Sequence, residues 1–303
     1  MTTMKKALTY TIIAGSRACV NDCPICISKM TPDNGIGYEK PEVDWDAFKR
    51  STHYAFNHGA EVALITGKGE PALYPAQVTE YLHRIEEIEN LRGERFDRRE
   101  IQTEGSLLAK GGHYDGWLDV WEDHGLDVVA LSIYHYDADK NEEVFRPKGG
   151  RKYFDLPELI EKLDSKGLKS RLSCVMLDGY IDCVEEVEKL IRYAEKNDVF
   201  QLTLRRADAP KKPLDLKAAE YVEGHRLSDE KFRDILDFLD EKGEFCYDLP
   251  HGALVYEVFG QNVCVTTGLT PAQRNKDDIR QLIFFPQGCL TTSWENVKGG
   301  RVL

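Results

Sequence analysis

Three cysteines near the N-terminus have a spacing that could hold a metal centre. Cys19, Cys23 and Cys26 lie within eight residues, in the pattern Cys-x3-Cys-x2-Cys. A structural zinc ion takes four protein ligands, and no second Cys-x2-Cys pair supplies the fourth. An iron–sulfur cube held by three thiolates keeps one iron open for a ligand from outside the chain. The number of cysteines therefore favours an iron–sulfur cluster, whereas zinc would need a distant Cys or His.

A glycine-rich segment with one carboxylate follows the second apolar run of the chain. It reads Thr66-Gly67-Lys68-Gly69-Glu70-Pro71. Glycines let the backbone approach a ligand closely, and a carboxylate complements an ammonium group. The same residues also suit an ordinary turn between a strand and a helix. We expect Lys68 to extend into solvent, with a bound ligand as the alternative.

Together these two segments resemble the radical S-adenosylmethionine (SAM) superfamily, and the similarity extends over roughly residues 8–210. The resemblance implies a [4Fe–4S] cluster on Cys19, Cys23 and Cys26, and a SAM amino group at the Gly67–Pro71 loop. Reductive cleavage of SAM would give a 5′-deoxyadenosyl radical that abstracts hydrogen from a substrate. The electron would come from a donor such as flavodoxin or ferredoxin.

The later strands look most like those of cyclic pyranopterin synthase and its relatives, which implies further cofactor contacts. Glu104 stands where these relatives have Asn, and Ile25 replaces an aromatic residue before the third cysteine. The chain also lacks the C-terminal cysteines that bind their auxiliary clusters. The residues expected to bind SAM are Ile25, Gly67, Gly69, Glu70, Pro71, Ser132, Arg146, Ser173 and Leu204.

Polar and aromatic residues on or after the fourth to sixth apolar runs are candidates for substrate binding. The basic stretch Arg205–Lys212 could receive a phosphate or a carboxylate, although a solvated loop edge explains it equally well. Cys289, with Cys174 as the alternative, is a candidate hydrogen-atom donor to a substrate radical, but most free cysteines are buried packing residues. The candidate substrate residues are Tyr134, His135, Tyr136, Arg171, Arg205 and Arg206.

Alternating strands and helices must position these residues. Apolar runs predict strands at Leu8–Ala14, Glu61–Thr66, Glu100–Thr103, Asp127–Tyr134, Lys169–Leu177 and Phe200–Arg205. Helical periodicity predicts helices at Asp44–His58, Pro75–Glu89, Gly116–His124, Leu156–Lys166 and Val184–Lys196. This alternation favours parallel strands, whose C-terminal ends gather the active site in barrels.

We therefore predict an α/β fold with two parts. Residues 1–212 form a partial (β/α)6 TIM-type barrel. Residues 213–303 form a β-rich C-terminal extension that covers or extends the barrel. It contains a helix at Ser228–Lys242 and short strands at Glu244–Tyr247, Ala253–Phe259, Asn262–Thr266 and Gln281–Phe285.

Composition excludes several other classes of protein. The chain has 303 residues and a formal net charge of −12, which argues against nucleic acid as a general partner. No apolar run approaches the ~18 residues that a membrane helix needs. Polar residues interrupt the first apolar segment, which favours a strand over a secretory signal and predicts a reducing, cytoplasmic location.

The expected function is that of a radical SAM enzyme acting on a small metabolite, anionic if the basic stretch contacts it. The outcome of the reaction stays open among rearrangement, cyclisation, epimerisation and oxidation. One alternative is a radical SAM enzyme that modifies a peptide. The others are a non-catalytic iron–sulfur protein for electron transfer or redox sensing, and a zinc-binding interaction module.

Overall fold

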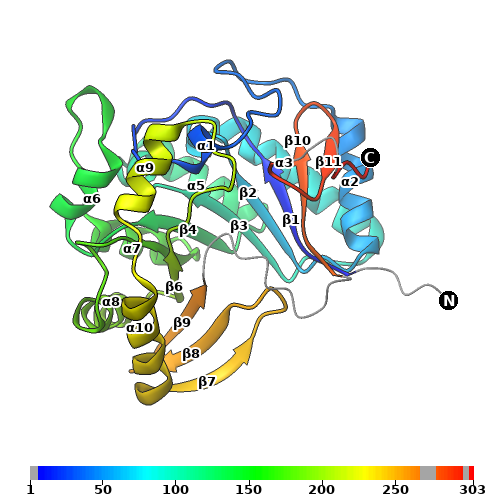
Figure 1. Ribbon diagram of the computed structural model, residues 1–303. Helices are drawn as coiled ribbons and strands as arrows, with labels where there is room; N and C mark the ends of the chain where they lie inside the picture. The colour runs from blue at the N-terminus through cyan, green and yellow to red at the C-terminus, as the bar shows by residue number, and fades with distance from the viewer. Residues whose placement is uncertain (1–5, 267–277, 296–299) are drawn as a thin grey trace.

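Parallel strands form one continuous sheet in the computed structural model, which describes residues 6–266, 278–295 and 300–303 (Figure 1). Each of the first six strands pairs in parallel with the next one along the chain. They are β1 (Ala7–Ile13), β2 (Val62–Thr66), β3 (Arg98–Thr103), β4 (Val128–Ile133), β5 (Lys169–Met176) and β6 (Gln201–Arg206). The predicted α/β fold with an open, parallel partial barrel is confirmed.

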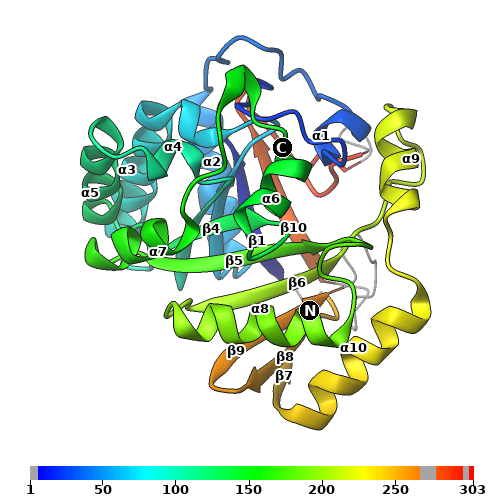
Figure 2. The same cartoon turned by 90° about the vertical axis from the view of Figure 1, so that its left-hand side faces the viewer.

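Helices cover the outer face of this sheet (Figure 2). The five predicted helices correspond to α2 (Trp45–Asn57), α3 (Pro75–Arg92), α5 (His113–Asp123), α7 (Leu156–Ser165) and α8 (Val184–Lys196). Shorter helices were not predicted: α1 (Ile27–Met30), η1 (Pro71–Leu73), α4 (Ser106–Ala109), α6 (Ala138–Phe145), η2 (Lys148–Gly150) and α9 (Leu216–Gly224). Each is too short for an apolar stripe repeated over several turns, which is the signal that the prediction used.

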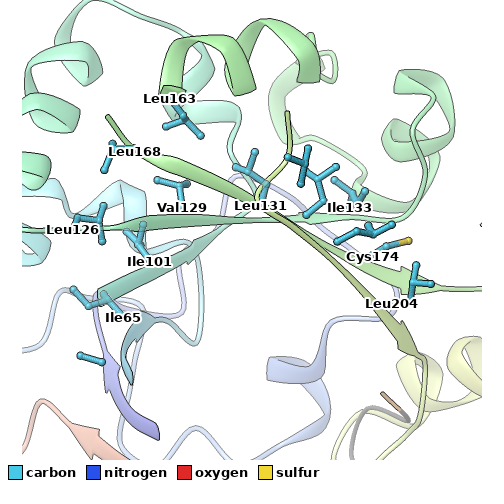
Figure 3. Packing of buried hydrophobic residues seen from close by; sticks show 14 of the residues in the cluster. Ile65, Ile101, Leu126, Val129, Leu131, Ile133, Leu163, Leu168, Cys174 and Leu204 are labelled. Atoms are coloured by element: carbon cyan, nitrogen blue, oxygen red, sulfur yellow. The ribbon is translucent and has the colours of Figure 1, made fainter. Parts of the chain in front are cut away.

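The hydrophobic core lies between the sheet and these helices. Figure 3 labels buried residues of this core, among them Leu131, Cys174 and Leu204. Side chains alternate between the two faces of a strand. The residue next to each of these core residues therefore faces the opposite, concave side of the sheet. These neighbours are Ser132 (after Leu131), Ser173 (before Cys174) and Arg205 (after Leu204). We call this concave side the barrel interior.

The C-terminal extension adds strands to both edges of the six-stranded unit. It contributes α10 (Asp229–Lys242), β7 (Gly243–Asp248), β8 (Leu254–Val258), β9 (Gln261–Thr266), β10 (Ile279–Phe285) and β11 (Cys289–Thr291). The strand order is β11-β10-β1-β2-β3-β4-β5-β6-β9-β8-β7, and the sheet does not close. The β-rich extension is therefore confirmed, whereas the division of the chain into parts at residue 212 stays a prediction.

The described part of the chain contains no helix that is a candidate for a membrane span. None of its helices combines the length and the apolar character that crossing a bilayer requires.

Candidate cluster and cofactor site

The three cysteines lie in the loop that leaves the C-terminal end of β1. The segment after α6 holds this loop in place: the Asp22 amide donates to the Phe145 carbonyl (3.1 Å), and the Lys148 amide donates to the Val20 carbonyl (2.9 Å). Cys19, Cys23 and Cys26 are all unpaired thiols and partly buried. The loop is thus fixed by backbone hydrogen bonds that leave its sulfurs available as ligands.

The surroundings of these thiols suit a metal centre. Burial raises the pKa of the Cys19 thiol to about 12, and burial also raises the pKa of Cys23 well above its usual range. A hydrogen bond from Tyr134 opposes this effect at Cys23 without overcoming it. Buried thiols of this kind stay protonated unless a metal supplies the positive charge that stabilises the thiolate.

The spacing of the sulfurs separates a cluster from a single zinc ion. Among the described residues, the one group of three His, Cys, Asp or Glu side chains with ligand atoms within 4.8 Å of one another is His83, Glu86 and His124. At least two of the cysteine sulfurs are therefore more than 4.8 Å apart. Thiolates on one tetrahedral zinc ion would lie about 3.8 Å apart, given Zn–S bonds of about 2.3 Å. The wider spacing fits the larger [4Fe–4S] cube.

The Gly67–Pro71 loop lies directly against the residues that precede the first cysteine. The Glu70 amide donates to the Ala18 carbonyl (2.9 Å). A Cβ atom on Gly69 would come within 2.0 Å of the same carbonyl oxygen, so only glycine fits at residue 69. This close approach places the glycine–glutamate loop beside the cysteine loop, as the family resemblance implies.

Glu70 is a buried carboxyl whose hydrogen bonds fix its orientation. One oxygen accepts from the Thr103 hydroxyl (2.6 Å) and the Ala72 amide (2.8 Å), and the other accepts from the Glu104 amide (3.1 Å). Burial, followed by the nearby Glu104 carboxylate, raises the pKa of Glu70 to about 8. A cation beside Glu70 would remove this cost of ionisation.

Glu104 and Asn21 are site residues that the sequence analysis did not assign. The Asn21 side-chain amide donates to Glu104 (3.1 Å), which joins the cysteine loop to the end of β3. The other Glu104 oxygen accepts from the Ser106 amide (3.1 Å). The substitution of Glu for the Asn of related enzymes was the available signal, because both oxygens of a carboxylate can accept hydrogen bonds, here from Asn21 and from the Ser106 amide.

Lys68 is buried, so the expectation that it extends into solvent is wrong. Its side chain is folded back beneath the loop: Nζ donates to the Thr31 hydroxyl (2.9 Å) and lies 5.4 Å from the centre of the Trp294 ring. Burial lowers the pKa of Lys68 to about 8. The Cys26 thiolate opposes this shift, which places the ammonium within electrostatic reach of the cysteine loop.

The residues predicted to contact SAM divide into two groups. Ser132 and Ser173 are register partners on β4 and β5 and face the barrel interior. Ile25 packs with Tyr134 and Phe145 beside the cysteine loop. These positions lie at the same end of the strands as the Gly67–Pro71 loop.

Two other predicted SAM contacts have different surroundings. Leu204 is fully buried in the helix-facing core (Figure 3), so at this position only the backbone is left to approach adenine. Arg146 ends α6 in a left-handed conformation (φ 50°), and its guanidinium lies 5.8 Å from the Tyr221 ring centre. Its backbone therefore anchors the cysteine loop while its side chain extends toward α9.

Three predicted substrate residues follow β4, and the structure separates them. Tyr134 is buried against Phe145 and lies beside Cys23, on the cluster side of the site. His135 Nε2 lies 3.4 Å from the Glu186 carboxylate, and the Tyr136 hydroxyl donates to the same group (2.8 Å). His135 and Tyr136 thus both contact Glu186 of α8, and their contact with substrate stays a prediction.

The predicted basic residues also separate. Arg171 faces the barrel interior and forms an ion pair with Glu100 of β3 (2.7 Å). Arg206 donates to the Leu227 carbonyl (2.6 Å) and to Asp229 (2.6 Å), so it joins β6 to the start of α10, and its contact with substrate stays a prediction. Arg205 faces the interior.

Cys289, the candidate hydrogen-atom donor, lies on the edge strand β11. It is partly buried and packs against a small apolar cluster that contains Ile13, Ile36 and Phe285. Cys174, the alternative candidate for this role, is fully buried in the helix-facing core. Donation of hydrogen by Cys289 stays a prediction.

Comparisons with known proteins agree with this geometry. The family model described as Radical SAM superfamily matches residues 13–194. No curated protein matches the sequence. Among solved structures, Streptococcus suis SuiB bound to S-adenosylmethionine is 14% identical with a TM-score of 0.56, over 95% of this chain and 58% of that chain.

Two further structures share the fold at the same low identity. The structure of anSMEcpe with bound AdoMet and Kp18Cys peptide is 14% identical, with a TM-score of 0.54, over 78% of this chain and 60% of that one. Methylornithine synthase (PylB) is 14% identical with a TM-score of 0.52, over 89% of this chain and 74% of that one. The chain spans about three fifths of the length of SuiB. The family match covers more than half of the sequence, and we conclude that the chain belongs to the radical SAM superfamily, which uses a [4Fe–4S] cluster and SAM.

Proposed function

We propose that this protein catalyses hydrogen abstraction from a small metabolite at the C-terminal end of its parallel strands. The observation that carries the proposal is the direct contact between the glycine–glutamate loop and the cysteine loop, through Glu70 and Ala18. When bound, the cluster and SAM supply one-electron cleavage of the SAM carbon–sulfur bond and a carbon radical that abstracts hydrogen. An electron donor of the flavodoxin or ferredoxin class would reduce the cluster.

The chain's own residues bind and orient the cofactors in this proposal. Cys19, Cys23 and Cys26 hold the cluster. Glu70 would accept hydrogen bonds from the SAM amino group, because three hydrogen bonds already orient its carboxyl and no cationic side chain in the described ranges forms an ion pair with it. Ile25 supplies an apolar contact to adenine, and the barrel interior beyond it receives the substrate.

A reducing compartment suits this chemistry. All eight cysteines are free thiols in the structure, which supports the expected cytoplasmic location. The acidic chain favours a small molecule over a nucleic acid.

SAM binding should release a proton near neutral pH. Glu70, with a pKa of about 8, is mainly protonated at pH 7 in the SAM-free protein, and an ammonium group beside it lowers that pKa. Binding then favours the ionised carboxylate, so affinity for SAM rises as pH rises from 6 to 8, by at most about tenfold per pH unit. The rise levels off above pH 8, where Glu70 is already ionised in the SAM-free protein.

Calorimetry of the reconstituted protein in buffers of different ionisation enthalpy measures this proton release. The Glu70→Gln variant keeps the shape of the side chain but has no proton to lose. It should bind SAM more weakly and show little change in affinity between pH 6 and pH 7.5. A wild-type affinity that is flat over the same range would argue against contact between Glu70 and the SAM ammonium.

The proposed function is tested by the release of 5′-deoxyadenosine. Anaerobically reconstituted protein, reduced with dithionite and given SAM, should form 5′-deoxyadenosine and methionine, and a pool of anionic metabolites should increase the rate. Reactions without reductant are the control. A protein that holds a full cluster and binds SAM but never forms 5′-deoxyadenosine would contradict the proposal.

A further inference from the structure

Arg205 is an interior arginine without a counter-ion. It lies near the C-terminal end of β6, and its neighbours in the strand, Leu204 and Leu202, are buried in the helix-facing core. Its Nε atom is buried and makes no hydrogen bond. No carboxylate in the described ranges forms an ion pair with Arg205. Arg205 as a whole is half-buried, and a guanidinium partly withdrawn from water without an anion is unfavourable by itself, so this arrangement needs an explanation.

The other arginines of the neighbouring strands all have partners, which makes Arg205 the exception. Glu100 of β3 forms ion pairs with both Arg98 and Arg171. Arg99 pairs with Glu89 on the outer face, and Arg206 pairs with Asp229. The fold thus supplies carboxylates or carbonyls for arginines that only stabilise it.

The interior around Arg205 is positively charged. Burial, then the charges of Arg171 and Arg280, lower the pKa of Arg205 to about 10, so it remains protonated at neutral pH. Burial, then the positive charges of Arg280 and Arg205, lower the pKa of His251 to about 4. His251 is therefore a neutral imidazole at neutral pH. Glu100 is already shared by two arginines. An anion that enters the interior would meet an excess of positive charge.

We propose that Arg205 binds the anionic group, a carboxylate or a phosphate, of the substrate inside the barrel. Arg205 lies at the same strand end as the cofactor loops. The identification of the anion as the substrate therefore rests on the proposed function. A guanidinium presents two parallel N–H donors to a carboxylate or phosphate, which fixes the orientation of the molecule as well as its position. Arg205 would act as a binding residue that holds the substrate carbon toward SAM.

Calorimetric titration of the SAM-loaded holoenzyme with inorganic phosphate and with succinate tests the site, and the two probes distinguish the two anion types. Replacing Arg205 by Gln should weaken the binding of the preferred anion at least tenfold, and Arg205→Lys should lie between Gln and wild type. Arg192→Gln is the matched control, because Arg192 is an exposed arginine on α8 that pairs with Glu188. This variant should bind both anions as the wild type does.

Thermal unfolding of the same variants without added anion gives an independent readout. Arg205→Gln removes a half-buried charge that has no ion-pair partner among the described residues, so its melting temperature should equal or exceed that of the wild type. Arg171→Gln removes a paired charge and should melt at a lower temperature. If the melting temperature of Arg205→Gln were as low as that of Arg171→Gln, Arg205 would be a residue that stabilises the fold, and the inference would be overturned.

Equal anion binding by Arg205→Gln and wild type, or no binding of either probe by the wild type, would also overturn the inference. Neither readout requires SAM cleavage. Arg205-dependent anion binding without 5′-deoxyadenosine formation would refute the proposed reaction and leave the anion site in place. Formation of 5′-deoxyadenosine without Arg205-dependent anion binding would support the proposed reaction and refute the anion site.

Discussion

Replacement of Cys23 by Ala should abolish 5′-deoxyadenosine formation, a loss of about 1000-fold or more, and should remove most of the bound iron. Three thiolates are the whole ligand set that the loop offers, since the remaining five cysteines lie on other elements. Two thiolates cannot hold a cube while leaving a single iron open for SAM. Cys19→Ala and Cys26→Ala should behave in the same way.

Iron and sulfide analysis, together with the absorbance of the cluster near 400 nm, checks this result. Cys246→Ala is the matched control, because Cys246 is an exposed thiol on β7. It should keep four irons per chain and full SAM cleavage. Cys289→Ala should also keep the cluster, and any change in its product would reveal a role as hydrogen-atom donor. A Cys23→Ala protein with a full set of irons would contradict the assignment of the cluster ligands.

Replacement of Gly69 by Ala should have the second-largest effect. The new Cβ atom would lie 2.0 Å from the Ala18 carbonyl oxygen and 2.7 Å from that of Ser16, and both are backbone atoms that cannot rotate away. The glycine–glutamate loop or the start of the cysteine loop must therefore shift. Overpacking of this kind costs about 3 kcal/mol in the free energy of unfolding. Because the displaced segments bind SAM and the cluster, SAM affinity should fall at least about 100-fold.

Gly37→Ala provides the comparison for this variant, because a Cβ atom on Gly37 meets nothing within 4 Å. Chemical denaturation of both variants measures the loss of stability, and SAM titration measures the loss of affinity. Gly37→Ala should match the wild type in both. If Gly69→Ala binds SAM normally, the contact between the two loops is not what positions the cofactor.

Much of the fold follows from sequence because β/α units carry strong local signals. All six barrel strands and the long helices were predicted to within a few residues, since apolar runs and amphipathic stripes report burial directly. The pairing of β10 with β1 was not predicted. Those two strands are separated by most of the chain, and no local pattern specifies which edge a C-terminal strand will join.

The alternation within β6 contained information that the sequence analysis left unused. Leu202 and Leu204 must face the same side, and an apolar pair of this kind belongs to the core. Leu204 therefore could not present its side chain to adenine, and Arg206 on the same face could not enter the barrel. Arg205, on the opposite face of the strand, faces the barrel interior.

Other site features depend on contacts between distant segments. The burial of Lys68 requires Thr31 and Trp294, and the hydrogen bond from Asn21 to Glu104 joins two loops separated by more than eighty residues. His135 and Tyr136 are engaged by Glu186 of α8. Spacing along the chain cannot predict these partners, because each depends on how the loops pack after the barrel has formed.

The electron paramagnetic resonance spectrum of the reduced cluster, recorded with and without SAM, tests the central claim most directly. A cube held by Cys19, Cys23 and Cys26 has one iron that lacks a protein ligand, and Glu70 is oriented to hold the SAM ammonium beside it. The account predicts that SAM changes the g values of the wild-type cluster and that Glu70→Gln needs more SAM to produce the change. A spectrum unaffected by saturating SAM, or a protein that binds one zinc ion and no iron, would contradict it.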